Sequence, residues 1–133
     1  MTSTSTSTAG QRSPAIRVSL LPRDTNALGT IFGGIILSYI DQAGAVEGHR
    51  HCEGRLVTVA MDKVEFHQPV FVGDLVSFYA ETIGVGRTSM TIRVVVEAER
   101  RGPGREIVKV TEAEVVYVQV DEAGKPLPIR ASS

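Results

Sequence analysis

The pattern of hydrophobic and polar positions predicts one long helix in a chain that otherwise has the pattern of β-strands. Between Phe32 and Arg50, apolar residues recur three and four positions apart, which is the spacing of a helix. At 1.5 Å per residue, this helix would be about 27 Å long. Its apolar residues cover most of the circumference instead of one stripe, so we expect the helix to be buried on most sides.

The remaining pattern alternates with the period of strands. We expect a short strand over 16–20 and long strands over 56–66, 75–83, 88–100 and 107–120. The order of one short strand, one long helix and four long strands predicts an α+β fold in which an antiparallel sheet wraps the helix. Such a sheet has open edges, which favour edge-to-edge dimerisation.

The strand over 56–66 has an irregular pattern. Its inward-facing residues are expected to change from Val57, Val59 and Met61 to Val64 and Phe66. Because alternation along a strand has a period of two, this change indicates a bulge or bend near 62–63.

Length and composition indicate one ordinary globular domain of 133 residues, 42% hydrophobic and 22% charged. We expect a disordered Ser/Thr-rich tail over 1–13, a single domain over 14–125 and a C-terminal tail over 126–133. The net charge of −1 gives no reason to expect a nucleic-acid partner or stable membrane association. The start of the chain lacks a secretory signal, and the single Cys52 fits a reducing compartment, so we expect a cytoplasmic location.

The middle of the predicted helix carries a carboxylate, Asp41. Its neighbours three and four residues away include Ser38, Gly44 and Ala45, and such small residues leave space for a ligand or a second chain. An aspartate on a helix is usually a solvated surface residue. On a helix that is apolar nearly all round, a functional role is favoured, with Asp41 as a general base or, as the second choice, a nucleophile.

Two further polar features precede Asp41. Gly33 and Gly34 start the helix, where unpaired N–H groups and the helix dipole could stabilise an oxyanion. The alternative is an ordinary helix start, in which the two glycines only let the helix pack closely against the sheet. Asn26 lies in the preceding loop, and its side chain is either an active-site amide or a turn-forming group.

Three other polar groups are candidates for binding or chemistry. The turn Gly86-Arg87-Thr88-Ser89 offers a cation and hydroxyls to a phosphate, although a plain hairpin turn is favoured from the residues alone. Arg100 and Arg101 pose the same choice between a solvated strand end and a phosphate contact. His49, His51 and Cys52 end the helix; they are too few for a zinc site, and a Cys52–His49 nucleophile pair lacks a third orienting group.

Several motifs, in this order, resemble the hotdog-fold acyl-CoA thioesterases, most closely the bacterial single-domain acyl-CoA hydrolases. They are Asp24-Thr25-Asn26-x-x-Gly29-Thr30-x-Phe32-Gly33-Gly34, then Asp41, Arg55-x-Val57-Thr58-Val59, Phe66-x-x-Pro69-Val70-x-Val72-Gly73-Asp74 and Gly86-Arg87-Thr88-Ser89. The resemblance covers residues 16–120.

The resemblance implies a hotdog fold, in which a five- to six-stranded antiparallel sheet wraps a long central helix. It implies a homodimer with active sites at the subunit interface and a trimer of dimers. It places the catalytic acid at Asp41 and an active-site amide at Asn26, which would face Asp41 of the partner subunit. Contacts with substrate and CoA are expected from Phe32, Arg87, Thr88 and Ser89. No metal or other cofactor is implied.

We therefore predict an acyl-CoA thioesterase that produces a free carboxylic acid and CoA. Asp41 would activate water, and the N–H groups of Gly33 and Gly34 would polarise the carbonyl. Two alternatives stay open. One is a hotdog dehydratase acting on 3-hydroxyacyl thioesters, which usually needs a His that the sequence lacks near Asp41. The other is a non-catalytic module that binds or senses acyl-CoA.

Overall fold

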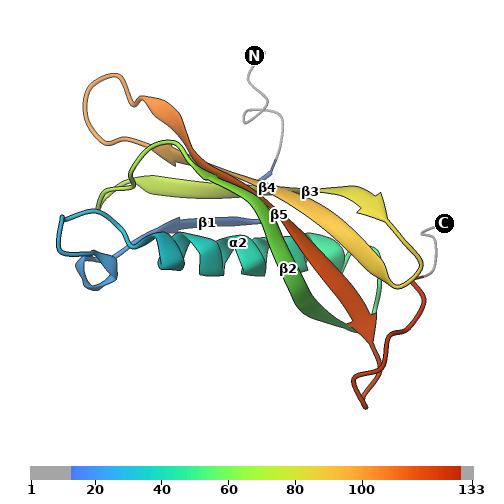
Figure 1. Cartoon of the computed structure of the whole chain (residues 1–133). Helices are drawn as coiled ribbons and strands as arrows, with labels where there is room; N and C mark the ends of the chain where they lie inside the picture. Colours follow the sequence, from blue (N-terminus) through green and yellow to red (C-terminus); the bar gives the residue numbers. More distant parts are fainter. Residues whose placement is uncertain (1–12, 130–133) are drawn as a thin grey trace, which may run out of the picture.

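The computed structural model describes residues 13–129, in which a long helix packs against a five-stranded antiparallel sheet (Figure 1). The elements are β1 (Ile16–Ser19), the 3-10 turn η1 (Pro22–Asp24), α2 (Gly33–Gly48), β2 (Arg55–Phe66), β3 (Leu75–Val85), β4 (Ser89–Glu99) and β5 (Ile107–Val120). The strand order is β1-β3-β4-β5-β2, and every neighbouring pair is antiparallel. The predicted α+β architecture is confirmed, with five strands.

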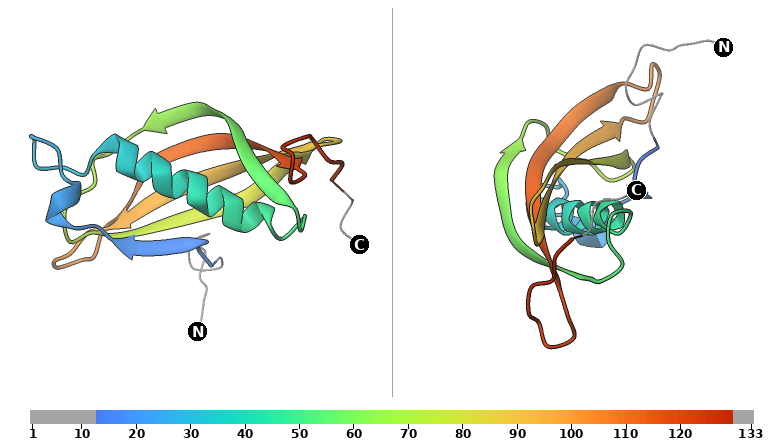
Figure 2. Two further views of the ribbon diagram at one scale, coloured as in Figure 1. Left: turned by 90° about the horizontal axis from the view of Figure 1, so that it is seen from below. Right: turned by 90° about the vertical axis from the view of Figure 1, so that its right-hand side faces the viewer.

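The helix lies on the concave side of a curved sheet, as the two views of Figure 2 show. The side chains of β4 that alternate toward the helix are almost completely buried: Met90, Ile92, Val94, Val96 and Ala98. Ile36, Ile40 and Ala43 of α2 belong to the same core cluster. This apolar layer fixes the position of α2 relative to the strands.

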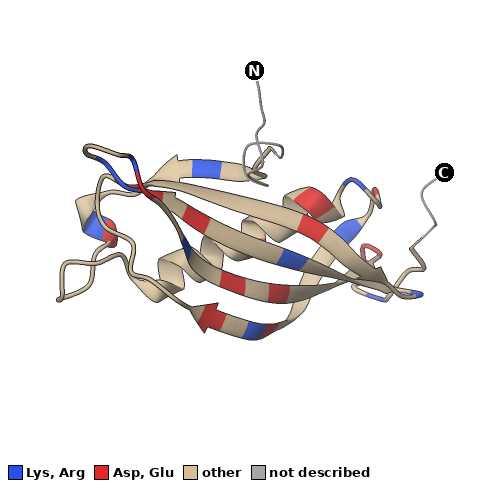
Figure 3. Cartoon of the chain, turned by 90° about the horizontal axis from the view of Figure 1, so that it is seen from above, with Lys and Arg blue, Asp and Glu red and all other residues tan. Residues whose placement is uncertain are grey.

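Figure 3 looks onto the convex face of the sheet and shows charged residues distributed along its strands. On that face Glu112 is the centre of an ion-pair network, with Arg93 at 2.6 Å and Lys109 at 2.9 Å. The Nε2 atom of His67 lies 3.0 Å from a Glu112 carboxylate oxygen. This part of the convex face is therefore polar, whereas the apolar side of the sheet packs against α2.

The helix α2 is shorter and less covered than predicted. It begins at Gly33, with Phe32 as its N-cap, and ends at Gly48, two residues before Arg50. The prediction that it is buried on most sides is wrong for the single chain, because the sheet covers only one face. The opposite face is exposed and carries Gly34, Ser38, Gln42 and Val46.

The inward-facing set of β2 also differs from the prediction. Val57 and Val59 are 42% and 56% exposed, and Phe66 is 53% exposed. The pairing of β2 with β5 shifts register between Thr58 and Ala60, so simple alternation does not hold there. Of the predicted set, Met61 and Val64 do pack against the core.

The predicted bend in β2 is confirmed. A second register shift separates Asp62 from Glu65, and Lys63 between them has a φ of +53°. This backbone conformation is rare for a residue with a side chain and marks an irregular point of the strand.

At the N-terminus, residues 1–12 of the predicted tail lie outside the described residues. At the other end, residues 126–129 are held against the sheet. The Leu127 N–H donates to the Gln119 carbonyl, and the Ile129 N–H donates to the Arg87 carbonyl, both at 2.7 Å. None of the helices within residues 13–129 has the length and apolar character needed to cross a membrane.

Candidate active site

Asp41 lies midway along α2, on the side that faces β2 and β5. Its Oδ1 accepts hydrogen bonds from the hydroxyl of Thr58 at 2.6 Å and from that of Tyr117 at 3.2 Å. The Tyr117 hydroxyl also lies 2.6 Å from the main-chain oxygen of Asp41. The other carboxylate oxygen, Oδ2, receives no hydrogen bond from residues 13–129. One oxygen is therefore held by the protein, and the other is free to accept a proton.

The side chain of Tyr117 occupies the space next to Gly44, which was expected to receive a ligand or a second chain beside Asp41. A Cβ at Gly44 would lie 3.0 Å from two ring carbons of Tyr117 and closer still to its hydroxyl. Burial, and then the negative charge of Asp41, raise the pKa of Tyr117, so its hydroxyl stays protonated and donates. A ligand must reach Asp41 from the side away from Gly44.

The first two residues of α2 present unpaired N–H groups. No side chain caps the helix at Phe32, and the N–H groups of Gly33 and Gly34 find no acceptor within residues 13–129. The hydroxyl of the nearby Thr30 accepts a hydrogen bond from the Asn26 side chain and does not cap the helix. A Cβ added at Gly34 would meet nothing within 4 Å, so the approach is open. Unpaired N–H groups at a helix start attract negative charge.

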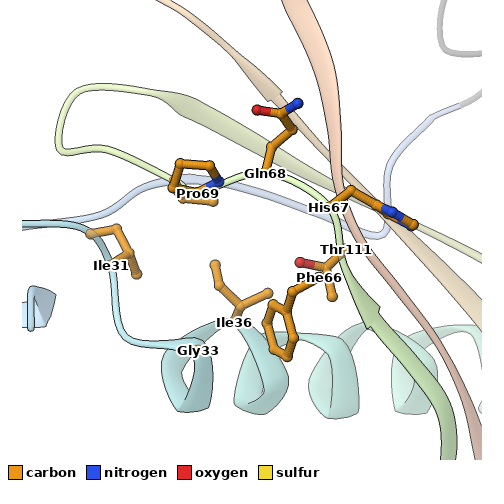
Figure 4. Close-up of a pocket in the computed structure, with 9 residues that line it drawn as sticks. Ile31, Gly33, Ile36, Phe66, His67, Gln68, Pro69 and Thr111 are labelled. Atoms are coloured by element: carbon orange, nitrogen blue, oxygen red, sulfur yellow. The ribbon is translucent and has the colours of Figure 1, made fainter.

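A hollow of about 290 Å³ opens beside the start of α2 (Figure 4). Its walls are mostly apolar and include Ile31, Ile36, Phe66, Pro69 and Val70. The ring of Phe66 lies against the helix start, 3.3 Å from where a Cβ of the first glycine would be. The hollow suits a ligand that has an apolar part and a polar atom near the helix start.

Within one chain, the N–H donors and the carboxylate do not meet. Gly34 and Asp41 are seven residues apart in the sequence. At 1.5 Å per residue, they are separated by about 10 Å along the helix axis. A reacting carbonyl has to lie about 3 Å from its donors and equally close to the attacking water. The N–H groups at a helix start also point away from the helix body, so a carbonyl bound to them lies farther still from Asp41, and a single α2 does not supply both groups to one carbonyl.

Asn26 forms a closed turn before α2. Its Oδ1 accepts from the N–H groups of Leu28 at 2.9 Å and Thr30 at 3.2 Å, and its Nδ2 donates to the Thr30 hydroxyl at 3.0 Å. These bonds match the turn-forming alternative, and among the described residues none of them involves Asp41. A catalytic contact of Asn26 across a dimer stays a prediction.

The turn between β3 and β4 lies at the opposite end of the fold from the start of α2 (Figure 1). The Gly86 N–H donates to the Ser89 carbonyl at 2.7 Å and closes this turn. Within one chain, the structure does not bring Arg87, Thr88 and Ser89 to the helix start. A contact between these residues and CoA stays a prediction for the assembled protein.

The loop between β4 and β5, to which Arg100 and Arg101 belong, lies at the same end of the fold as the start of α2 (Figure 1). The Arg100 guanidinium is 2.5 Å from Asp74 Oδ2 and stacks over the ring of Phe71, 4.8 Å from its centroid. The Nε of Arg101 donates to the Gly73 carbonyl at 2.7 Å. These contacts tie the β2–β3 loop to the β4–β5 loop, and a contact with a CoA phosphate stays a prediction.

The residues at the helix end do not form a nucleophile pair. His51 lies 3.4 Å from the Glu47 carboxylate, and His49 is exposed. The Cys52 sulfur lies 3.7 Å from the Gly48 carbonyl, and burial raises the pKa of this thiol. A thiol with a raised pKa is a poor nucleophile at neutral pH, which argues against a Cys52–His49 pair.

One group on the convex face has the composition of a metal site. Glu65, His67 and Glu112 bring one ligand atom each to within 4.8 Å of one another. Arg93 and Lys109 already contact Glu112, and their positive charge disfavours a further cation. We interpret the group as part of the ion-pair network.

Thr58 and Tyr117 are the site residues that sequence reasoning missed. Tyr117 continues the inward-facing series of Ala113 and Val115 on β5, so its direction could be read from the alternation. A buried tyrosine hydroxyl usually finds a polar partner, and Asp41 is the carboxylate of the facing helix. The direction of Thr58 was hidden by the irregular pairing of β2.

Known proteins are similar to this chain in sequence and fold. Residues 28–104 match the family described as the Thioesterase superfamily. The acyl-CoA thioester hydrolase YciA of Escherichia coli (strain K12) is 41% identical over 118 residues, which are 86% of this chain and 89% of that protein. A Zymomonas mobilis protein named as an uncharacterized acyl-CoA thioester hydrolase is 44% identical over 117 residues, which are 87% of this chain and 77% of that protein.

Among solved structures, Cj0915 of Campylobacter jejuni, a hexameric hotdog fold thioesterase, has a TM-score of 0.85 and 43% identity, over 90% of this chain and 91% of that chain. This chain belongs to the thioesterase superfamily and has the hotdog fold.

Proposed function

We propose that the protein hydrolyses acyl-CoA thioesters to a free carboxylic acid and CoA, with Asp41 as the general base. The observation that carries this proposal is the state of the Asp41 carboxylate, with Oδ1 held by Thr58 and Tyr117 and Oδ2 unpaired within residues 13–129. Oδ2 takes a proton from water while the water oxygen attacks the carbonyl carbon of the thioester. Asp41 then returns the proton to the thiolate of CoA as the carbon–sulfur bond breaks.

The carbonyl oxygen becomes negative in this step and needs hydrogen-bond donors. The unpaired N–H groups of Gly33 and Gly34 at the start of α2 are suited to that charge. The apolar hollow beside Gly33 has room for the first part of an acyl chain. Water and these protein groups suffice for the reaction, so we propose no metal or other cofactor.

The site is proposed to be shared by two subunits. Since Gly34 and Asp41 of one helix are about 10 Å apart, the donors and the base that serve one carbonyl come from different copies. The long strand β2 forms one edge of the sheet, and its exposed Val57 and Val59 flank Thr58. Pairing of this edge with the same edge of a second copy would cover these residues and bring Asp41 to the interface.

A trimer of such dimers is the proposed assembly, as the hexameric C. jejuni thioesterase has six subunits by its description. In this arrangement the exposed face of α2 is also available for contacts between copies. The location is proposed to be cytoplasmic.

The test is hydrolysis of a panel of acyl-CoAs of increasing chain length, followed by a dye that reports free thiol. Asp41→Asn and Asp41→Ala should lower kcat by about 10²- to 10⁴-fold, the usual effect of removing a general base. Glu81→Gln, which changes an exposed carboxylate on β3, is the control and should keep the wild-type rate. Wild-type turnover by the Asp41 variants would refute the proposal.

The same panel separates the alternative functions. A dehydratase would interconvert enoyl-CoA and 3-hydroxyacyl-CoA without releasing thiol. A sensing module would bind acyl-CoA without releasing thiol or changing the acyl group. Either result with the wild-type protein would replace hydrolysis as its function.

A further inference from the structure

The hydroxyl of Tyr117 occupies a notch in α2 that exists only because residue 44 is a glycine. Tyr117 is 1% exposed, and Gly44 is buried beneath it. A Cβ at Gly44 would collide with the tyrosine hydroxyl and would lie 3.0 Å from two ring carbons. The hydroxyl is therefore placed against the helix backbone, which an ordinary side chain at position 44 would prevent.

From this notch, the hydroxyl contacts Asp41 at two atoms. It lies 2.6 Å from the main-chain oxygen and 3.2 Å from Oδ1 of the side chain. The main-chain contact fixes the hydroxyl relative to the helix axis, and the contact with Oδ1 then restricts rotation of the carboxylate. Thr58 donates to the same Oδ1 from the other strand, β2. Tyr117 shares its single hydroxyl proton between the main-chain oxygen and Oδ1, so together with Thr58 it holds Oδ1, and Oδ2 is left without a hydrogen bond from residues 13–129.

We infer that Tyr117 is a positioning residue for the thioesterase reaction, which aims Oδ2 of Asp41 at the attacking water. This inference rests on the proposed role of Asp41 as the general base. Tyr117 touches neither water nor substrate in this arrangement, because its hydroxyl is enclosed between β5 and α2. Its loss should therefore change the rate of the chemical step and leave substrate binding as it is.

The first experiment compares Tyr117→Phe with the wild-type protein in steady-state hydrolysis of one acyl-CoA. We expect kcat to fall by about 10- to 100-fold, since small misplacements of a catalytic group have effects of this size. KM should change by less than about twofold, because a group that acts only on the chemical step does not alter ground-state binding. Thr91→Val, which removes a hydroxyl from the β4 residue between buried Met90 and Ile92, is the control and should keep the wild-type kcat.

A double-mutant cycle that combines Gly44→Ala with Tyr117→Phe separates an effect on the position of the Asp41 carboxylate from a general loss of structure. The added methyl group should lower the unfolding temperature and kcat together, because it displaces the Tyr117 hydroxyl. In the double variant Gly44→Ala/Tyr117→Phe the hydroxyl is gone, so part of the unfolding temperature should return. Its kcat should stay at the level of Tyr117→Phe or below. A kcat that rises with the unfolding temperature across the three variants would show that Tyr117 acts only on stability, and would overturn the inference.

Asp41→Asn in the same assay distinguishes the two proposals. If this variant is inactive while Tyr117→Phe has the wild-type kcat, the positioning role fails and the proposed function stands. If Asp41→Asn keeps the wild-type rate, the assignment of the base fails, and the role of Tyr117 fails with it.

Discussion

The hydroxyl of Thr58 lies 2.6 Å from Oδ1 of Asp41 and joins the edge strand β2 to the helix α2. Thr58 stands between Val57 and Val59, whose side chains are exposed in the single chain. The segment that is proposed to meet a second subunit therefore also contacts the proposed base. The proposed assembly and the proposed catalysis therefore depend on the same short piece of strand.

Replacement of Thr58 tests this contact. Thr58→Val keeps the shape of the side chain but removes the donor, so Asp41 Oδ1 loses its shorter hydrogen bond. We expect kcat to fall by about 10-fold, in the range of one lost hydrogen bond to a charged group. Thr58→Ser keeps the hydroxyl and should recover most of the rate. Equal rates for the Val and Ser variants would contradict a role for the hydroxyl.

Gly34 allows one N–H group to be removed with little change to the helix. Proline is tolerated in the first turn of a helix, where the N–H has no intrahelical partner. Gly34→Pro should lower kcat by about 10²- to 10³-fold, the usual effect of losing one oxyanion donor. Gly34→Ala adds a methyl group into open space and keeps the N–H, so its rate should fall far less. Circular dichroism checks that both variants keep the helix, and equal kcat values for them would exclude this N–H as a donor.

Charge on the edge of β2 should separate the subunits. Val57→Lys combined with Val59→Lys places two cations on the strand edge that is proposed to pair with its own copy, where they would face the same charges. We expect a smaller native mass by sedimentation and loss of thioester hydrolysis together. Ile107→Lys, at the exposed start of β5, is the control and should change neither property. An active monomer would show that one chain holds a complete site.

The ion pairs of Glu112 predict a pH dependence of stability. Lys109, then His67 and Arg93, lower the pKa of Glu112 from its usual 4.5 to about 2. Because the folded-state pKa is depressed, these contacts stabilise the fold fully above about pH 5 and lose that effect as the pH falls toward 2. Urea unfolding should show Glu112→Gln to be less stable than wild type near neutral pH, with the difference shrinking below about pH 4.5. Glu122→Gln, an exposed turn residue, should show no such trend.

The strands and the helix were predictable because their side chains repeat with a clear period. In β4, the alternation from Met90 to Ala98 identified every buried side chain of that series. The pattern failed in β2, where register shifts next to Thr58 and Asp62 break the period of two. The shift after Asp62 was indicated by the changed pattern of β2, but the shift next to Thr58 depends on pairing with β5, which the local sequence does not reveal.

The site was predictable only in part, for a related reason. Asp41 and the glycines at the helix start stand out in the sequence because a carboxylate and paired glycines are unusual on an apolar helix. The partners of Asp41 do not stand out, since Thr58 and Tyr117 come from strands far along the chain. Gly44 was predicted to leave space beside Asp41, and the side chain of Tyr117 occupies that space.

The spacing of Gly34 and Asp41 along α2 has a genetic consequence. If each reaction uses the donors of one subunit and the base of the other, a chain with a damaged base still contributes donors, and a chain with damaged donors still contributes a base. Two alleles that are each inactive alone would then complement each other in one cell, because a mixed dimer contains one intact site. Variants that inactivate the donors and variants that inactivate the base should therefore form two complementation groups, although Gly34 and Asp41 lie only about 10 Å apart on one helix.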